Sequence, residues 1–153
     1  MKISTRARYA IRAMIHIARN SKNGTPVTLK AVGAKTAISR RYLEQLVIPL
    51  KSANLIRGIS GKNGGYVLAK APDEIRVGDI VQAAIGPINV VNCVNDPDSC
   101  MNVELCECRP LYTMINSKIV DAMNDFSLAD LAGKNGVEGT CRKSEPPSAH
   151  GNA

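Results

Sequence analysis

The first 70 residues hold three short amphipathic segments followed directly by a glycine-rich basic stretch, and this order constrains the fold more than any other feature. Over residues 5–20 the apolar side chains recur at helical spacing, and most arginines lie off that stripe. The pair Asn23-Gly24 ends this segment. A second short helix is expected over residues 29–35, where Thr28 can cap the first free amides.

A third helix is expected to begin after Ser39, whose hydroxyl can cap it. Its buried stripe has the spacing i, i+3, i+4, i+7 and consists of Leu43, Leu46, Val47 and Leu50. Pro49 lacks the amide hydrogen that would bond to the Gln45 carbonyl. The sequence therefore predicts a kink or an end of this helix near Ile48.

Two apolar runs, Leu55-Ile56 and Tyr66-Val67-Leu68, flank a turn over residues 60–65, and this pattern predicts a β-hairpin. Three glycines of the turn allow the positive backbone angles that a hairpin demands: Gly61, Gly64 and Gly65. Arg57 and Lys62 make the hairpin basic. Three helices followed by a basic hairpin define a winged helix-turn-helix, a mainly α fold with a small β-hairpin wing.

The two parts of the chain on either side of Pro72 carry opposite charge. Residues 1–72 hold fourteen Lys or Arg and one acid, Glu44, whereas residues 73–153 hold six basic and twelve acidic residues. So large a local positive charge opposes folding by self-repulsion unless a polyanion offsets it, which indicates nucleic acid as the partner. The alternative is a solvated basic face. One Phe and four Tyr are too few for a base-stacking platform, so duplex DNA is favoured.

The acidic part predicts two further amphipathic helices. The first covers residues 77–84 and ends at Gly86-Pro87. The second is longer, and Pro110 suits its first turn. Its apolar stripe extends over more than four turns and consists of Leu111, Ile115, Ile119, Ala122, Met123 and Phe126.

The end of the chain predicts one more short helix and a tail. Ser127 and Asp130 have the spacing of a capping box, which predicts a helix through Leu131. The remainder has too few apolar residues to order itself. Four parts are therefore expected: a winged helix-turn-helix domain at 1–86, a cysteine-bearing loop at 87–109, a dimerisation helix with a short terminal helix at 110–132, and a disordered tail at 133–153.

The long apolar stripe also predicts a homodimer. A stripe of this length on a helix that projects from a small domain needs a partner helix. Two-fold dimerisation through it matches the two half-sites that helix-turn-helix proteins bind. The alternative is a helix that folds back on its own domain.

The exposed face of the third helix and the wing supply six candidates for DNA contact: Arg40, Arg41, Glu44, Gln45, Arg57 and Lys62. In the major groove Arg41 can fork onto guanine and Gln45 onto adenine. Glu44 can accept from the cytosine amino group, or it can form a helix-stabilising pair with Arg40 or Arg41. Arg40 is assigned to phosphate. The two wing residues can enter the minor groove or contact its phosphates, or they are solvated charge.

Four of the five cysteines lie within sixteen residues, at Cys93, Cys100, Cys106 and Cys108. In a reducing cytosol such grouping indicates metal binding or redox chemistry before structural disulfides. The C-x6-C-x5-C spacing can wrap a loop around an inorganic centre, whereas tetrahedral zinc sites usually show paired C-x2–4-C units. The spacing of the cysteines therefore favours an iron–sulfur cluster over a zinc site, but only modestly.

Several blocks of the sequence together resemble a known family. These blocks are Ser4–Ala10, Ile38-Ser39 with Tyr42–Leu46, Gly64–Leu68, Val77–Ile80, three cysteines and Ser127–Leu131. Over roughly residues 1–132 the chain resembles the Rrf2 family of bacterial winged-helix transcription regulators. Within that family it is similar to the IscR-like branch, which holds an iron–sulfur cluster.

The resemblance implies a homodimer crossed by the long helix, with a cluster on Cys93, Cys100 and Cys106 of each subunit. We favour a 2Fe-2S cluster over a 4Fe-4S cluster. Loss or oxidation of the cluster would change DNA affinity or sequence preference. In the IscR-like branch, the residues matching Glu44 and Gln45 belong to the recognition helix.

Two departures from the family pattern concern the proposed cluster ligands. The first cysteine gap is one residue longer than usual, and Arg109 stands where the IscR-like branch has a histidine ligand. The fourth ligand is therefore open. Cys108 is the first choice because a thiolate is a good iron ligand, and Cys141 or an exchangeable water comes next. Alternatively, Cys108 is an idle neighbouring thiol.

These expectations describe a cluster-sensing transcription regulator that binds a double-stranded DNA operator and is not an enzyme. No apolar run is long enough to span a membrane and no signal segment opens the chain, so a cytoplasmic protein is expected. One alternative keeps the DNA-binding fold but gives the cysteines a zinc site or a thiol switch. Another is a thiol enzyme or metal-delivery protein, which the absence of a Cys-His pairing and of a C-x-x-C motif disfavours.

Overall fold

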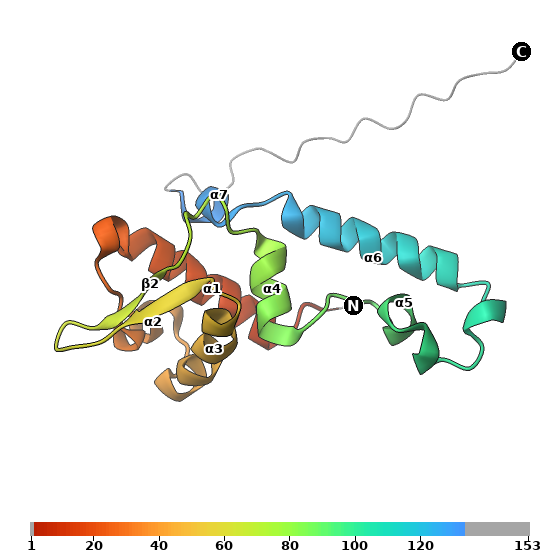
Figure 1. Cartoon of the computed structure of the whole chain (residues 1–153), viewed down its shortest axis with the longest axis horizontal. Helices are drawn as coiled ribbons and strands as arrows, with labels where there is room; N and C mark the ends of the chain where they lie inside the picture. The colour runs from red at the N-terminus through yellow and green to blue at the C-terminus, as the bar shows by residue number, and fades with distance from the viewer. Residues whose placement is uncertain (1, 134–153) are drawn as a thin grey trace, which may run out of the picture.

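The computed structural model describes residues 2–133, which form helices and one two-stranded antiparallel hairpin (Figure 1). In chain order the elements are α1 (Thr5–Asn20), η1 (Lys22–Gly24), α2 (Leu29–Thr36), α3 (Arg40–Ser52), β1 (Ile56–Ile59), β2 (Gly65–Leu68), α4 (Val77–Ile85), α5 (Asn92–Asn95), η2 (Pro97–Ser99), η3 (Val103–Leu105), α6 (Arg109–Asn124) and α7 (Leu128–Ala132). The predicted mainly α fold with a hairpin wing is confirmed. The expected disordered tail, apart from Gly133, lies outside the described residues.

Helices α2 and α3 begin where a hydroxyl side chain accepts a hydrogen bond from a free backbone amide. Thr28 accepts from the Ala31 amide at 3.2 Å and Ser39 from the Tyr42 amide at 3.3 Å, so both predicted caps are confirmed. Helix α2 ends at Ala37, which has a left-handed φ of 56°. That sharp reversal leads the chain directly into α3 and makes the turn of the helix-turn-helix.

The predicted end near Ile48 is wrong, because α3 continues as one helix from Arg40 to Ser52 with Pro49 inside it. Proline removes one helix hydrogen bond, the one to the Gln45 carbonyl. Gln45 is exposed, so water can satisfy that carbonyl. The buried side chains of Val47 and Leu50 hold this turn against the core and offset the cost of the proline.

The wing, which we define as the β1–β2 hairpin of residues 56–68, pairs Ile56 with Leu68 at its base. Only Gly61 among its turn glycines has a positive φ, at 118°, so the prediction that Gly64 and Gly65 are needed for their backbone angles is wrong. They are needed because other backbone comes close. A Cβ on Gly65 would lie 2.6 Å from the Val27 carbonyl oxygen, where the chain before α2 pairs with β2.

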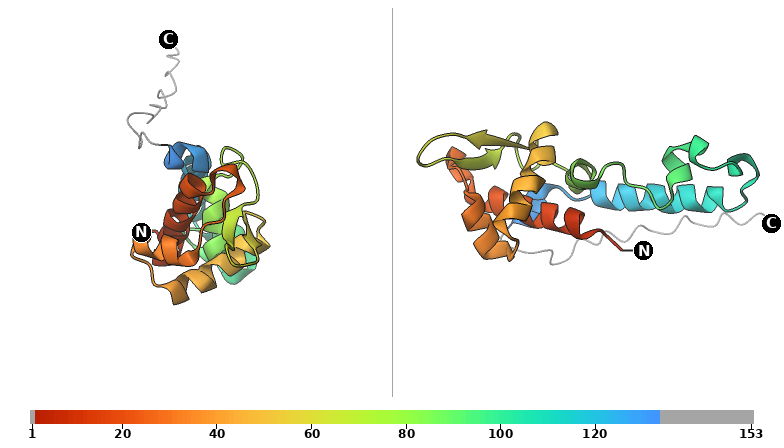
Figure 2. Two further views of the ribbon diagram at one scale, coloured as in Figure 1. Left: turned by 90° about the vertical axis from the view of Figure 1, so that its left-hand side faces the viewer. Right: turned by 90° about the horizontal axis from the view of Figure 1, so that it is seen from below.

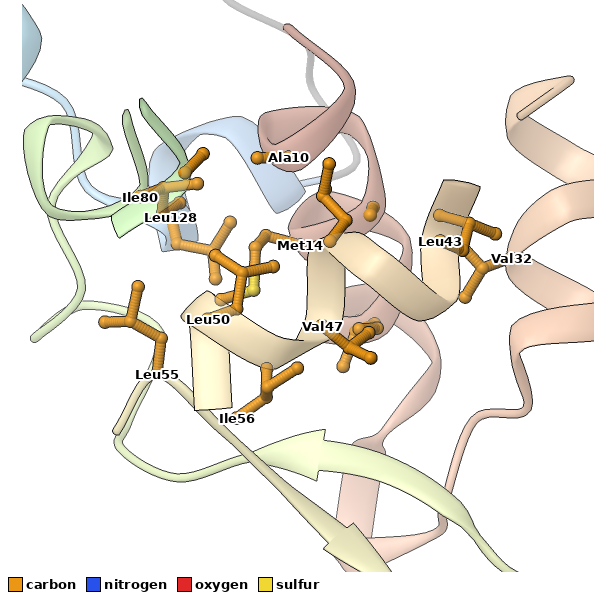
Figure 3. Close-up of a cluster of buried hydrophobic side chains, with 14 of the residues drawn as sticks. Ala10, Met14, Val32, Leu43, Val47, Leu50, Leu55, Ile56, Ile80 and Leu128 are labelled. Carbon is orange, nitrogen blue, oxygen red and sulfur yellow. The ribbon is translucent and has the colours of Figure 1, made fainter. Parts of the chain in front are cut away.

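The main core joins α1, α3, the base of the wing, α4 and α7. Figure 3 shows Met14 of α1, Leu43, Val47 and Leu50 of α3, and Leu128 of α7 among the side chains that fill it. Met14, Leu50 and Leu128 are fully buried. Helix α7 therefore contributes to the same core as the helix-turn-helix, although some 80 residues separate them in sequence.

Helix α6 extends away from this core in Figure 1 and in the view from below in Figure 2, with the short α5 beside its N-terminal half. It also packs against α4. At the C-terminal end of α6 the chain returns to the domain, where the Val77 amide donates to the Phe126 carbonyl at 3.0 Å and the Leu128 amide to the Ile75 carbonyl at 2.7 Å. Among the described residues, no helix combines the length and apolarity that a bilayer span requires.

Candidate nucleic-acid interface and cysteine loop

The exposed face of α3, which we call the recognition face, carries Arg40, Arg41, Glu44 and Gln45. The opposite face is buried through the predicted stripe of Leu43, Leu46, Val47 and Leu50. Burial of one face against the core thus fixes which side chains point outward. All four predicted residues of α3 lie together on one accessible surface.

Glu44 forms an ion pair with Arg40 across one helical turn. The Arg40 Nε and Glu44 Oε1 atoms are 2.9 Å apart, and the side chains are 75% and 51% exposed. Such an exposed i, i+4 pair contributes only about 0.3–0.5 kcal/mol to folding. Arg41 and Gln45 make no side-chain hydrogen bond within residues 2–133, so their donors are free for another molecule.

The wing places Arg57 on β1 and Lys62 in its turn, and both are exposed. Sequence reasoning missed Lys70, which lines an open pocket of about 530 Å³ together with Arg57, between the C-terminal end of α1 and the wing. The net charge of residues 1–72 was the available signal for Lys70, because every Lys or Arg there adds to the basic surface.

The cysteine loop, residues 87–109, connects α4 to α6. Cys93 lies in α5, Cys100 and Cys106 follow η2 and η3, and Cys108 is the N-cap residue of α6. All four are free thiols, partly or fully exposed, and none belongs to a hydrophobic cluster. Within residues 2–133 no three His, Cys, Asp or Glu side chains lie close enough together to hold one metal ion.

Three of the four thiols lie within electrostatic reach of Tyr112, one turn into α6. The charge of Cys108 raises the pKa of the Tyr112 hydroxyl, a hydrogen bond to the same thiol adds to this, and Cys106 and Cys93 act in the same direction. Tyr112 therefore lies in the electrostatic field of these three thiols, although they are not close enough together to hold one metal ion within residues 2–133. Sequence reasoning missed Tyr112, although its i, i+4 spacing from Cys108 was a usable signal.

One hydrogen bond fixes the start of the cysteine loop to α6. The Val90 amide donates to Asn116 Oδ1 at 3.0 Å, and Asn116 is the buried residue of α6. Asn95 Nδ2 donates to the Ile88 carbonyl at 3.3 Å within the loop. Ile88, near the start of the loop, also packs against the cluster of Ala7, Val77 and Val81, so this end of the loop is attached to the domain.

Comparison with known proteins identifies the class of protein. A family model named Rrf2 and described as an iron-dependent transcriptional regulator matches residues 3–134. The chain belongs to the Rrf2 family. It is 38% identical over 132 residues to the HTH-type transcriptional regulator CymR of Bacillus subtilis, covering 86% of this chain and 90% of CymR. It is 34% identical over 131 residues to IscR of Erwinia tasmaniensis, covering 86% of this chain and 78% of that IscR.

Solved structures of Rrf2 relatives agree with this assignment. The structure of CymR, titled the global cysteine regulator of B. subtilis, superposes with a TM-score of 0.70 at 36% identity and covers 86% of this chain and 96% of CymR. T. potens IscR superposes with a TM-score of 0.67 at 29% identity and covers 86% of this chain and 85% of that one. These Rrf2 relatives are transcriptional regulators and not enzymes, so this chain is a DNA-binding transcription regulator of their class.

Proposed function

We propose that this Rrf2 protein is a homodimeric regulator that reads an operator in double-stranded DNA with α3 and the wing, and that senses a chemical signal through the cysteine loop. The recognition face carries the proposal. It presents two arginines and a glutamine outward from a helix that follows a tight turn, in a domain with a large positive charge.

Each residue of the recognition face has a proposed role. Arg41 and Gln45 have free side-chain donors and would read guanine and adenine. Arg40 would contact a phosphate. Glu44 would accept a hydrogen bond from a cytosine amino group, either after its ion pair with Arg40 breaks or while the pair remains. Arg57 and Lys62 of the wing would contact the minor groove or its phosphates.

The DNA proposal is tested with a duplex that the wild-type protein selects from a randomised pool. Arg41→Ala combined with Gln45→Ala should lower affinity for that duplex at least about 30-fold, because each bidentate base contact contributes about 1–3 kcal/mol. Asp73→Ala, at an exposed position outside both α6 and the basic part of the chain, is the control and should bind nearly as wild type does. Unchanged affinity and sequence preference in the double variant would contradict the assignment.

The proposed homodimer rests on the exposed surface of α6. Asn116 is the one buried residue of that helix within the described chain, and the apolar Leu111 and Met114 are 50% and 56% exposed. The predicted stripe is therefore only partly covered by its own chain: Met123 and Phe126 pack against the cluster of Ala7, Val77 and Val81, whereas Leu111 at the other end stays half exposed. A second copy of α6, related by a two-fold axis, would cover it and place two recognition faces for two half-sites.

We further propose that the cysteine loop holds an iron–sulfur cluster on Cys93, Cys100 and Cys106, with Cys108 as the fourth ligand. The donor set suits this group, since four free thiols lie on one loop and none packs in the core. A bound cluster would supply a redox-active centre. The loop would have to close, because its donors are not yet gathered.

A thiol switch is the second candidate. The four free thiols support it, as does the likeness to Staphylococcus aureus CymR, whose structure in an oxidised form superposes with a TM-score of 0.67 at 32% identity. In such a switch a peroxide would oxidise two thiols to one disulfide and would itself be reduced to water.

Anaerobic purification separates these candidates. The cluster proposal expects coloured protein with iron and acid-labile sulfide, which Cys93→Ser, Cys100→Ser and Cys106→Ser each abolish, together with DNA binding that changes on exposure to air. Zinc in place of iron and sulfide would contradict the cluster. Colourless, metal-free protein whose DNA binding changes with hydrogen peroxide and recovers with dithiothreitol would establish the thiol switch instead.

A further inference from the structure

Ile48 of α3 is a large apolar side chain that the fold leaves in solvent. It is 65% exposed and stands directly before Pro49. Among the described residues of the helix-turn-helix and the wing, Ile59 at 40% is the other large apolar side chain that is exposed. An isoleucine so far out of the core adds little to the hydrophobic stabilisation of the fold.

The position of Ile48 continues the recognition face by one helical turn. Arg41, Glu44, Gln45 and Ile48 have the spacing i, i+3, i+4, i+7, which places them along one side of a helix, and all four are exposed. The buried stripe that begins at Leu43 has the same spacing on the opposite side. Ile48 therefore points to the same surroundings as the three polar side chains.

Helix formation gives no reason for an isoleucine at this position. A branched β-carbon restricts the side chain in a helix, so alanine or a straight-chain residue is more favourable at an exposed helix position. The ring of a proline also disfavours helical backbone at the residue before it. Ile48 has both disadvantages, and its side chain is not buried in return.

A single exposed apolar residue is common on protein surfaces and by itself indicates no ligand. The alignment of Ile48 with three proposed base-reading residues is the observation that indicates one. We infer, on the basis of the DNA proposal above, that Ile48 contacts the C5 methyl group of a thymine in the major groove and thereby selects thymine at one position of each half-site.

The chemistry of the base edges supports thymine as the contacted base. Its C5 methyl is the one methyl group that the four bases present in the major groove. The contacts proposed for Arg41, Gln45 and Glu44 are hydrogen bonds to guanine, adenine and cytosine, and none of them recognises a methyl group. Ile48 supplies an apolar surface for the fourth base.

The geometry of α3 sets where that thymine lies. Ile48 is about 4.5 Å further along the helix axis than Gln45 and about 10 Å further than Arg41. Successive base pairs are about 3.4 Å apart along the duplex. For a helix that lies along the major groove, the thymine is therefore about one base pair beyond the base that Gln45 reads, and about three beyond the base that Arg41 reads.

The test removes the methyl group from the DNA and the side chain from the protein. The duplex is the one that the full wild-type chain selects from a randomised pool, and each thymine is replaced in turn, in both half-sites, by deoxyuridine, which pairs like thymidine but lacks the methyl. Affinity is measured for wild type, Ile48→Ala and Ile48→Leu. Ile85→Ala, which removes an exposed isoleucine from the end of α4, is the matched control.

We expect one thymine position at which deoxyuridine lowers wild-type affinity about fourfold per half-site, the effect of burying one methyl-sized group. Ile48→Ala should bind the two duplexes equally, whereas Ile48→Leu and Ile85→Ala should keep most of the difference. In selection from the randomised pool, Ile48→Ala should lose the base preference at that position alone. Its thermal midpoint should equal or exceed that of wild type, because alanine favours a helix more than isoleucine does.

Any of three results would overturn the role of Ile48: a selected site with no preferred thymine, a wild-type affinity that no deoxyuridine lowers, or a thymine preference that survives in Ile48→Ala. If Arg41→Ala combined with Gln45→Ala still weakens binding, the DNA proposal stands in each case. If that double variant binds as wild type does, the DNA proposal fails and the role of Ile48 fails with it. A thermal midpoint of Ile48→Ala clearly below that of wild type would assign Ile48 to the fold.

Discussion

Glu44 is the single acid of the basic part of the chain, and it lies on the recognition face in an ion pair with Arg40. An exposed pair of this kind stabilises a helix by only about 0.3–0.5 kcal/mol. Its weakness leaves the carboxylate available, because a cytosine amino group could replace the arginine at little cost in folding energy. The ion pair therefore does not prevent the base contact proposed for Glu44.

Glu44→Gln should change the unfolding free energy by less than about 0.5 kcal/mol while altering the bases selected at one position of each half-site. Selection from a randomised duplex pool, together with thermal unfolding, measures both quantities. Arg40→Gln breaks the same pair from the other side and is the matched control. Equal base preferences in wild type and Glu44→Gln would show that Glu44 does not contact a base and acts only through its ion pair with Arg40.

The lack of a side chain at Gly65 allows β2 to pack closely against the backbone of Val27, in the extended segment before α2. Gly65→Ala would place a Cβ 2.6 Å from the Val27 carbonyl oxygen, and both residues belong to backbone that cannot easily move. We expect a loss of about 1–3 kcal/mol in unfolding free energy, the usual cost of overpacking. Gly58→Ala serves as control, because its Cβ would lie at an ordinary 3.8 Å from Tyr66. Chemical denaturation of both variants measures the difference, and equal stabilities would contradict the contact.

At the scale of elements, α7 depends on the capping box formed by Ser127 and Asp130. The Ser127 amide and hydroxyl donate to Asp130 Oδ2 at 2.8 and 2.7 Å, and the Asp130 amide donates to Ser127 Oγ at 3.2 Å. The side-chain hydrogen bond from Ser127, followed by the backbone one, holds the pKa of Asp130 below its ordinary value of 3.8. The lowered pKa means that the ionised carboxylate stabilises the folded chain.

This contribution should be present above pH 3.8 and should disappear as the pH falls through the lower pKa of the folded state. Asp130→Asn should therefore lower the thermal midpoint at pH 7, and the gap from wild type should close as the pH approaches that lower value. Asp73→Asn, at an exposed carboxylate outside the box, is the control. A gap that stayed constant with pH would show that Asp130 acts through something other than its charge.

Sequence patterns predicted most elements because their causes are local. The caps at Thr28 and Ser39, the apolar stripe of α3 and the capping box of α7 each involve residues within about two turns of one another. Pro49 was misjudged because the packing of Val47 and Leu50 against distant helices decides whether the helix continues. The position of the cysteine loop against α6 depends on the hydrogen bond from the Val90 amide to Asn116, which joins residues 26 apart in sequence, so no local pattern indicates it.

At the scale of the whole molecule, the elongated shape in Figure 2 separates the helix-turn-helix and the wing from the N-terminal half of α6. Leu111→Glu combined with Met114→Glu should convert the proposed dimer to a monomer, because charged side chains would have to be buried between two copies of α6. Both positions are about half exposed in the single chain, so the fold should survive. Light scattering measures the mass, and circular dichroism the helix content.

The monomer should also bind a two-half-site duplex far more weakly than wild type, since the second half-site is no longer held at a high effective concentration. Thr113→Glu, exposed on the same turn, is the control and should remain dimeric. If the double variant kept the wild-type mass, α6 would not form the dimer interface.

Leu128 of α7 packs in the same core as α1 and α3. The helix-turn-helix and the wing therefore do not form a domain that can be separated from α7 without loss of stability. A fragment that stopped before α6 would have a vacancy between α1 and α4 the size of a leucine side chain, and a hole of that kind typically costs about 2–5 kcal/mol. For so small a protein that is a large share of the total stability. Any event that loosens the attachment of α7 would thus be felt at α3, even though the two helices share no stretch of sequence.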